Sequence, residues 1–323
     1  MTRDIGLLIN GSWVDGRAGQ PEALISPVDG KEIARVHQAD DAQLDSAVEA
    51  AWGAQRELAT LTAFDRAARD RGVADRVEGG GETLARELSA ENGKPMQAEA
   101  VPEVAAAVEM FRDAAEAAKR LETSVIPSSD RQKRVLTLRE ARGVYGILTP
   151  WNFPATIPSE YLSAGLATGN GMVWKPSELT PMTAAHIAKC FVDAGVPNGA
   201  LNLLHGDPSG IGGGIASHTG VTAVGLTGSS RTGQIVAELA AGKPLLLELG
   251  GNCPVVVFDD VDVEAVAEKL AFGCFANAGQ ICDSVERILC HGAVYEDLIE
   301  AVTAAAGKVE LGDPFQRATT MGP

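Results

Sequence analysis

The sequence has little positive charge. Its 323 residues include 27 Lys and Arg against 43 Asp and Glu, which gives a formal net charge of −16. A surface this acidic repels the phosphates of nucleic acid and of anionic membranes. The densest basic cluster, at residues 131–134, fits a solvated strand edge better than a binding patch. We therefore expect neither nucleic acid nor a membrane as a partner.

Paired and metal-binding cysteines are also missing. The five cysteines are an odd number, and none of them forms a Cys-x-x-C motif. Cys274, Cys282 and Cys290 follow one another at intervals of eight, which is not a spacing typical of metal ligands. This pattern predicts reduced thiols, a cytoplasmic location and no metal site.

Long apolar runs are absent as well. The first residues lack the apolar stretch of a signal peptide, and no apolar window reaches membrane-spanning length without a charge or a Gly or Pro. Aromatic residues make up only 5%, whereas there are 36 glycines and 45% of residues are hydrophobic. This composition is typical of a globular α/β protein with many tight turns, and the length suffices for two domains.

The order of the expected elements divides the chain. Residues 5–37 read as short strands and turns, and residues 41–121 as helices, with Asp40 and Asp41 capping the first. Residues 123–141 resemble a projecting hairpin that needs a covering partner, so we expect an oligomer contact there. Strands are expected near 144–148, 172–174, 200–204, 223–226, 245–249, 254–258 and 287–290, and helices near 157–167, 182–194, 208–217, 231–241, 262–276 and 294–306. Strands that alternate with helices predict a parallel sheet covered on both faces.

Three residues have the chemistry of acyl transfer. Cys282 follows a Gly-Gln turn that suggests exposure at a helix end, where a thiolate is favoured, although most free cysteines are buried and inert. Asn152, in the turn at 149–154, could donate to an oxyanion or only close the turn. Glu248 ends a strand and precedes two glycines, as either a general base or a solvated charge.

The segment at 228–233, Gly-Ser-Ser-Arg-Thr-Gly, lies between a strand and a helix, so its N–H groups and the helix dipole suit a pyrophosphate. The segment is not a G-x-G-x-x-G loop, and such a turn is often only a turn. Lys175 and Glu178 follow the end of a strand, where a carboxylate can bind ribose hydroxyls. They could equally be a solvated ion pair.

Five motifs together resemble the ordered motif set of the aldehyde dehydrogenase superfamily, from about residue 7 to the last residue. They lie at residues 149–154, 175–178, 227–229, 248–252 and 279–282. The resemblance implies oxidation of an aldehyde to an acid through a thiohemiacetal and a thioester. It assigns Cys282 as nucleophile, Asn152 as oxyanion donor and Glu248 as base.

The resemblance also implies a Rossmann-like cofactor domain at 1–122 and 142–248, an oligomerisation hairpin at 123–141, and the first part of an α/β catalytic domain at 249–323. NAD is the expected cofactor, because Glu178 would repel the 2′-phosphate of NADP. The implied cofactor-binding residues are Trp151, Lys175, Glu178, Gly212, Gly228, Ser229 and Gly233.

The end of the sequence departs from the family pattern. The last residues match a segment inside the family's catalytic domain, so we expect a C-terminally truncated chain: a fragment, a natural truncation or one part of a split protein. Strands and helices after residue 253 would then expose apolar faces, which predicts low stability and weak or no activity.

The complete protein is expected to be a homodimer or homotetramer that acts on a small aldehyde. A non-catalytic NAD-binding scaffold and a coenzyme A-acylating dehydrogenase remain alternatives, and Glu248 weighs against the latter.

Overall fold

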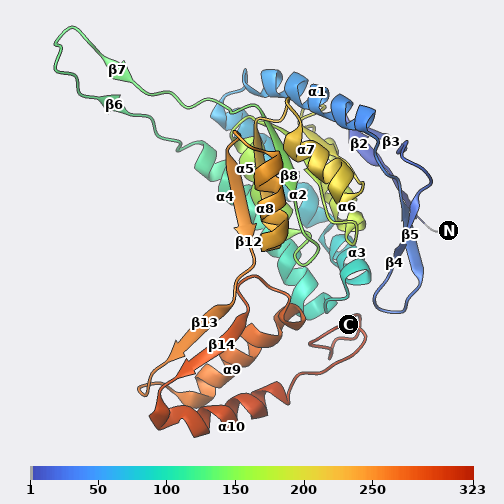
Figure 1. Cartoon of the computed structure of the whole chain (residues 1–323), viewed down its shortest axis with the longest axis vertical. Helices are drawn as coiled ribbons and strands as arrows, with labels where there is room; N and C mark the ends of the chain where they lie inside the picture. The colour runs from blue at the N-terminus through green and yellow to red at the C-terminus, as the bar shows by residue number, and fades with distance from the viewer. Residues whose placement is uncertain (1–2) are drawn as a thin grey trace.

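A seven-stranded sheet organises the larger part of the molecule. The computed structural model describes residues 3–323, and its sheet has the strand order β12-β11-β8-β9-β10-β2-β3 (Figure 1). The strands are β2 (Leu7–Ile9), β3 (Ser12–Val14), β8 (Val144–Leu148), β9 (Gly171–Lys175), β10 (Leu201–Leu203), β11 (Ala223–Gly228) and β12 (Leu245–Leu249). The five strands from β8 to β12 pair in parallel, as the alternation of strands and helices predicts.

The N-terminal strands extend this sheet. β2 pairs antiparallel with β10 and with β3, an addition that the sequence pattern did not indicate. A separate three-stranded sheet contains β1 (Arg3–Ile5), β4 (Glu22–Ile25) and β5 (Glu32–Val36). Short strands with turn residues between them were therefore predicted correctly, whereas their partners were not.

Helices cover both faces of the large sheet, because its central strands are apolar on both sides. Ile147 and Met172 belong to one buried core, and their chain neighbours Leu148 and Val173 belong to the other. The helices of this lobe are α1 (Asp41–Leu58), α2 (Ala63–Gly79), α3 (Gly81–Asn92), α4 (Val101–Ala118), α5 (Thr156–Ala167), α6 (Pro181–Asp193), α7 (Gly213–Ser217) and α8 (Ser230–Leu239). Two π-helical turns, Met96–Ala100 and Pro208–Gly212, precede α4 and α7.

Helix boundaries follow local capping chemistry. Asp40 forms a capping box with Gln43 at the start of α1, as its position predicts. Gly80 separates α2 from α3, and Gly93 ends α3 with a φ of 91°, a left-handed conformation that favours glycine. The helix expected at 208–217 is instead a π-helical turn followed by the five residues of α7.

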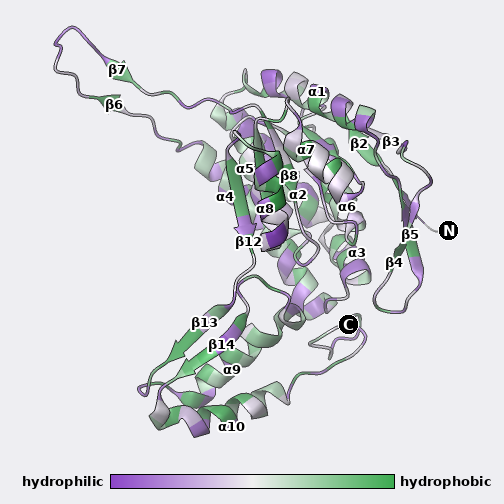
Figure 2. Ribbon diagram, viewed as in Figure 1, coloured by the Kyte–Doolittle hydropathy of each residue, from purple (hydrophilic) through white to green (hydrophobic). Residues whose placement is uncertain are grey.

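The hairpin expected at 123–141 is present. Strands β6 (Val125–Ile126) and β7 (Val135–Leu136) pair antiparallel, and the arm projects from the body (Figure 1). Its apolar side chains face solvent in this chain, with Val125 71% and Leu138 79% exposed, and they alternate with polar segments (Figure 2). The role of the hairpin as an oligomer contact stays a prediction.

A smaller lobe follows β12. It contains β13 (Cys253–Val257), α9 (Val263–Phe275), a 3₁₀ turn (Ala276–Gly279), β14 (Val285–Cys290), a second 3₁₀ turn (Gly292–Val294) and α10 (Tyr295–Ala306). β13 and β14 pair in parallel, and no third strand joins them within residues 3–323. Val256, Phe272 and Leu289 are more than half exposed, which agrees with the expected apolar faces.

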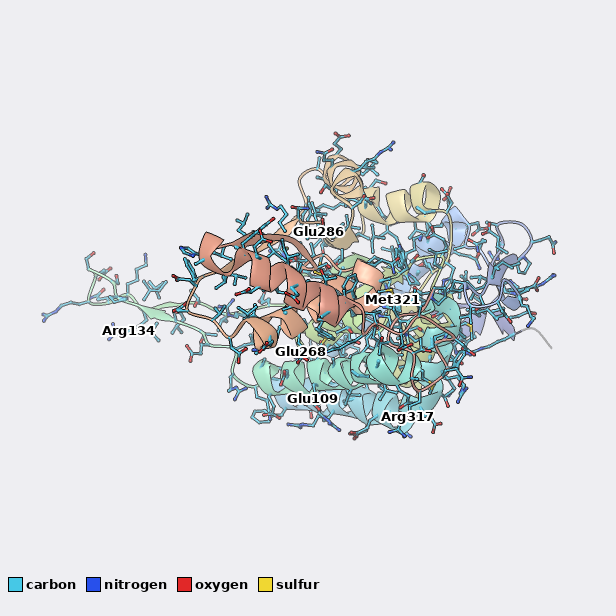
Figure 3. The ribbon with its side chains drawn as sticks, turned by 90° about the horizontal axis from the view of Figure 1, so that it is seen from below. Glu109, Arg134, Glu268, Glu286, Arg317 and Met321 are labelled. Carbon is cyan, nitrogen blue, oxygen red and sulfur yellow. The ribbon has the colours of Figure 1, made fainter. Side chains whose placement is uncertain are left out.

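The last residues return to the larger lobe. The amide of Met96 donates to the carbonyl of Pro314 at 2.9 Å, and the Arg86 guanidinium lies 5.7 Å from the Phe315 ring centroid. Viewed from below, Arg317 lies on the side of the molecule opposite to Arg134 of the hairpin (Figure 3). None of the helices in the described part of the chain is long and apolar enough to span a membrane.

Candidate active site

The loop that carries Cys282 has an unusual backbone. Asn277, Ala278 and Gly279 all have positive φ, at 47°, 55° and 76°, and Asn277 and Ala278 are strained there because only glycine adopts this region freely. The Asn277 amide donates to Glu99 Oε1 at 3.0 Å, and its Nδ2 donates to the carbonyl oxygen of Asn152 at 3.0 Å. These bonds tie the end of α9 to the larger lobe and hold the turn before Cys282.

Asn152 lies directly beside this loop. Its Nδ2 donates to the carbonyl oxygen of Gln280 at 2.9 Å, two residues before Cys282. Its Oδ1 is buried and accepts no hydrogen bond within the described residues. The structure thus brings the segments of Asn152 and Cys282 together across the two lobes.

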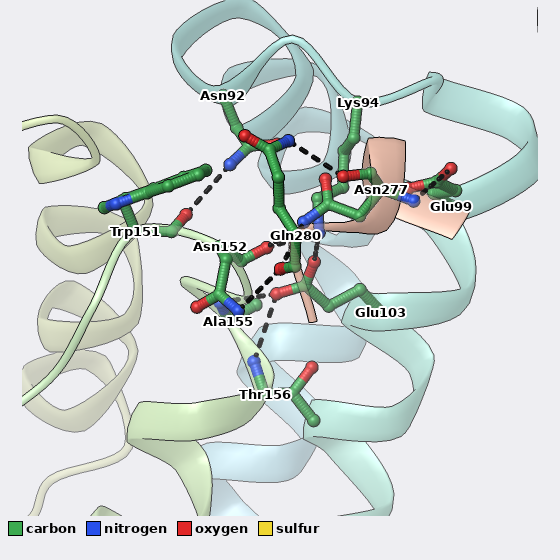
Figure 4. A network of polar contacts seen from close by, with 10 residues as sticks. All are labelled: Asn92, Lys94, Glu99, Glu103, Trp151, Asn152, Ala155, Thr156, Asn277 and Gln280. Atoms are coloured by element: carbon green, nitrogen blue, oxygen red, sulfur yellow. Dashed lines mark hydrogen bonds and ion pairs between the residues drawn. The ribbon is translucent and has the colours of Figure 1, made fainter. Parts of the chain in front are cut away.

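A buried ion pair supports the Asn152 loop from behind (Figure 4). Lys94 Nζ lies 2.6 Å from Glu103 Oε2, and Lys94 also donates to the Asn152 carbonyl oxygen at 2.8 Å. Glu103 Oε1 accepts from the amides of Ala155 and Thr156 at 2.8 and 3.3 Å, where α5 begins. Sequence reasoning missed this pair. The signal was a glutamate on the apolar face of α4, next to Val104 and four residues before Ala107.

Glu248 and Cys282 line one cavity of about 520 Å³, together with Glu160, Tyr161 and Thr227. Cys282 is exposed, as its turn predicts. Glu248 is the penultimate residue of β12 and pairs in register with Thr227 of β11. The cavity therefore joins the predicted nucleophile to the predicted base. Asn152 is not among its lining residues and is linked to the Cys282 loop only through its bond to the Gln280 carbonyl.

The expected activation of Cys282 by a helix end is wrong. The residue follows the 3₁₀ turn after the C-terminus of α9 and precedes β14, so it does not lie at the N-terminus of a helix, the end that favours a thiolate. Partial burial raises the pKa of the Cys282 thiol, and the Asp283 carboxylate raises it further. Backbone N–H donors act in the opposite direction but do not reverse the shift.

A groove of about 570 Å³ lies at the carboxyl ends of β8, β9 and β11. The chain leaves β8 toward β9 on one side and later returns to β11 on the other, so this is the switch point where open parallel sheets bind ligands. Lys175, Glu178, Gly212 and Gly228 line the groove. Thr227 lines both the groove and the cavity of Cys282.

Charge in the groove comes from a partly buried pair. Lys175 Nζ lies 3.7 Å from Glu178 Oε2, with the lysine side chain 7% exposed and that of the glutamate 55% exposed. Burial lowers the pKa of Lys175, and the Glu178 and Asp207 carboxylates partly oppose that shift. The alternative of a fully solvated pair is thus wrong for Lys175.

Three of the predicted cofactor-binding residues do not line the groove in the described part of the chain. They are Trp151, Ser229 and Gly233. The Trp151 carbonyl accepts from Asn92 Nδ2 at 2.8 Å, and Ser229 Oγ accepts from the Thr232 amide at the start of α8. A Cβ at Gly233 would lie 2.7 Å from Leu249 Cδ2, so this glycine allows α8 to pack on β12. Arg231 and Thr232, which belong to the predicted segment 228–233, line the groove, whereas sequence reasoning missed Ile235 and Leu239 on the same helix.

Comparison with known proteins identifies the family. The sequence pattern of the aldehyde dehydrogenase family matches residues 13–323, and this chain belongs to that family. The Arabidopsis thaliana protein "Aldehyde dehydrogenase family 2 member B4, mitochondrial" is 37% identical over 322 residues, which are 98% of this chain and 60% of that protein. The Bacillus subtilis alpha-ketoglutaric semialdehyde dehydrogenase is 36% identical over 98% of this chain and 65% of its own length.

Solved structures agree. An Escherichia coli NADP-dependent enzyme superposes with a TM-score of 0.97 at 33% identity, covering 100% of this chain and 67% of that one. An NAD-dependent benzaldehyde dehydrogenase from Corynebacterium glutamicum gives 0.94 at 35% identity, covering 99% and 70%. The resemblance seen in the motifs and the α/β fold class are confirmed. The chain spans 60% and 65% of the two curated relatives described above.

Proposed function

We propose that the complete protein oxidises an aldehyde to the carboxylic acid, with NAD as the hydride acceptor. The observation that carries the proposal is that Glu248 and Cys282 share a cavity which adjoins the cofactor groove at Thr227. The Cys282 thiolate would attack the carbonyl carbon and form a tetrahedral thiohemiacetal. Loss of hydride from that carbon gives a thioester on Cys282, and water cleaves the thioester to the acid.

Asn152 is proposed to stabilise the oxyanion of the tetrahedral adduct. A carboxamide nitrogen carries two N–H donors, and the Gln280 carbonyl takes one of them. The second remains for an oxygen bound near Cys282. Removing one such donor from a comparable oxyanion hole costs roughly 3–4 kcal/mol of transition-state stabilisation.

Glu248 is proposed as the base that deprotonates Cys282 or the hydrolytic water. Burial and the Asp283 carboxylate raise the pKa of Cys282, so a base that takes the thiol proton would favour attack. Glu248 lines the same cavity and forms no ion pair within the described residues. A base so placed favours transfer of the acyl group to water over transfer to coenzyme A.

The cofactor site is proposed to hold NAD through Lys175 and Glu178 at the adenosine ribose. Gly212 and the turn at Gly228 give the pyrophosphate room, and Ser229 orders that turn. Relatives include both NAD-dependent and NADP-dependent enzymes, so the preference rests on the Glu178 carboxylate alone. In Glu178→Gln, the kcat/KM ratio of NAD to NADP should fall. An unchanged ratio would remove this argument.

Steady-state assays of the complete protein test the reaction. With a simple neutral aldehyde, Cys282→Ala should abolish NADH formation, whereas Cys290→Ala, at a cysteine outside the cavity, should retain it. Glu248→Gln should slow turnover severely. NAD binding with no turnover of any aldehyde would support a scaffold role, and product formation only with coenzyme A would support an acylating enzyme.

We further propose that the hairpin contacts a second copy of the protein, since its apolar side chains are exposed here.

A further inference from the structure

The cavity next to Cys282 has an acidic and aromatic wall. Glu160 and Tyr161 come from α5, Tyr145 from β8 and Glu248 from β12. All four line the same volume of about 520 Å³ as Cys282. The lining residues include no Lys, Arg or His among those the structure describes. A charged group that enters this space therefore meets carboxylates and aromatic faces.

The two carboxylates are not neutralised by the protein. The Glu160 and Glu248 side chains are both exposed, and neither forms an ion pair or a hydrogen bond within residues 3–323, whereas other exposed glutamates, such as Glu116 and Glu78, pair with arginines. Burial raises the pKa of Glu160, and repulsion from Glu248 raises it further. Burial also raises the pKa of Tyr161, the hydrogen bond to Thr227 lowers it, and the Glu248 and Glu160 carboxylates raise it further. Burial is the largest cause of both shifts, and the smaller contributions from the carboxylates reflect the negative charge that lines the cavity.

Two tyrosine rings line the cavity beside these carboxylates. Tyr161 Oη lies 2.9 Å from Thr227 Oγ1, so the ring is fixed at its outer end to β11. Tyr145 lies on the adjacent strand β8 and lines the same space. An aromatic face attracts a cation because the ring face carries negative charge. Carboxylates beside aromatic rings are the usual chemistry for binding an ammonium group.

We propose that this cavity selects aldehydes that carry a positive charge, such as amino- or trimethylammonio-aldehydes, over aldehydes that carry a carboxylate. The inference rests on the proposed function and assigns its substrate class. Glu160 and the tyrosine rings would hold the ammonium group, while Cys282 attacks the carbonyl carbon at the other end. The Glu248 carboxylate, which lines the same cavity, adds to the selection.

A thiol-modification experiment tests the charge of the cavity without requiring turnover. Three methanethiosulfonates are compared, with trimethylammonioethyl, sulfonatoethyl and methyl groups. The Cys282 thiolate attacks the thiosulfonate sulfur, which forms a mixed disulfide and releases methanesulfinate, and mass spectrometry of the Cys282 peptide gives the rate. We expect the cationic reagent to react about tenfold faster than the anionic one, each normalised to the neutral reagent.

Variants separate the cavity from the net charge of the whole chain. Glu160→Gln should lower the cation-to-anion ratio several-fold, whereas Glu49→Gln, which removes an exposed carboxylate on α1 outside the cavity, should leave it unchanged. Equal effects of both substitutions would overturn the proposal, because the preference would then come from the overall charge. A ratio near one in the unmodified chain would also overturn it.

Kinetics of the complete protein then test the substrate class. We expect kcat/KM to decrease from 4-(trimethylammonio)butanal to pentanal to succinate semialdehyde, and Glu160→Gln to reduce the difference between the first and the last. Turnover that favours the semialdehyde would overturn the substrate class. No turnover of any of the three would instead overturn the proposed function, and the modification rates would still report the charge of the cavity.

Discussion

The ammonium of Lys94 and the carboxylate of Glu103 lie 2.6 Å apart, with their side chains 0% and 2% exposed. The pair connects the turn after α3 to α4 and also bonds the backbone at Asn152, Ala155 and Thr156. It is therefore the support of the loop that carries the proposed oxyanion donor. The Phe153 ring centroid, 3.9 Å from Lys94 Nζ, adds a cation–π contact.

Breaking this pair should unfold the loop and weaken the protein. Glu103→Gln removes the only carboxylate of the described residues in direct contact with buried Lys94, although Glu99 still acts on it from farther away, and breaking a buried pair typically costs about 3–5 kcal/mol. Urea denaturation should show that decrease in the free energy of unfolding. Activity of the complete protein should fall more than stability explains, because Asn152 loses its fixed position.

The matched control is Glu109→Gln on the same helix. Glu109 pairs with Arg112 at 2.8 Å, but both side chains are solvent-exposed, so its loss should cost under about 1 kcal/mol. The double variant Lys94→Met, Glu103→Leu should be more stable than Glu103→Gln alone, since it removes both buried charges. Equal stability of Glu103→Gln and Glu109→Gln would show that the pair is not structural.

Alkylation of Cys282 should depend on pH as an unactivated thiol does. Burial and Asp283 raise its pKa, so the rate of reaction with iodoacetamide should still be rising at the alkaline end of the accessible range. Asp283→Asn removes the second cause and should move the profile to lower pH. A plateau near neutral pH in the unmodified chain would contradict this account and indicate an activated thiolate.

Local signals predicted the elements well because they act locally. The Asp40 capping box, Gly80 and Gly93 fix helix ends through contacts within a few residues, and the sequence contains those contacts. Strand partners that are distant in the sequence were harder to predict. The residues of β2 (Leu7–Ile9) contain no local signal that this strand pairs with β10, which lies some 195 residues later in the sequence.

The candidate site shows the same division. The residue types at 152, 248 and 282 identify the chemistry, and the structure places Glu248 and Cys282 on one cavity. The Lys94–Glu103 pair was not predicted, because it depends on how α4 packs against the turn after α3 and the Asn152 loop within the larger lobe. The left-handed backbone at Asn277 was not predicted, because bonds to Glu99 and Asn152 of the larger lobe hold it. The assumed helix-end activation of Cys282 failed because a strand, and not a helix, follows it.

Replacing glycine by alanine should have opposite effects on stability at Gly171 of β9 and at Gly53 of α1, because only Gly171 is closely packed. A Cβ at Gly171 would lie 2.2 Å from the Ala51 carbonyl oxygen, where backbone of α1 crosses β9, so Gly171→Ala should cost about 1–3 kcal/mol or prevent folding. Gly53 lies on the exposed side of α1 with open space around its Cβ position, so Gly53→Ala should stabilise by about 0.5–1 kcal/mol. Thermal melts of both variants test this, and equal signs would contradict it.

Asp70 should make stability fall as pH rises. Its carboxylate is buried in α2, accepts no hydrogen bond within the described residues, and has a pKa that burial raises to about 9, while Arg66 acts weakly in the other direction. The unfolded chain loses this proton near its ordinary pKa of about 4, so the folded state binds more protons between the two values. Stability from the neutral carboxyl is complete below pH 4 and is lost progressively as pH rises toward 9.

The test compares Asp70→Asn with Asp75→Asn, an exposed position on the same helix. Between pH 6 and 8 the free energy of unfolding of the unmodified chain should fall by up to about 1.4 kcal/mol per pH unit relative to Asp70→Asn. Asp75→Asn should follow the unmodified chain. If all three proteins show the same dependence on pH, Asp70 is ionised in the folded state and its site contains a compensating partner such as water.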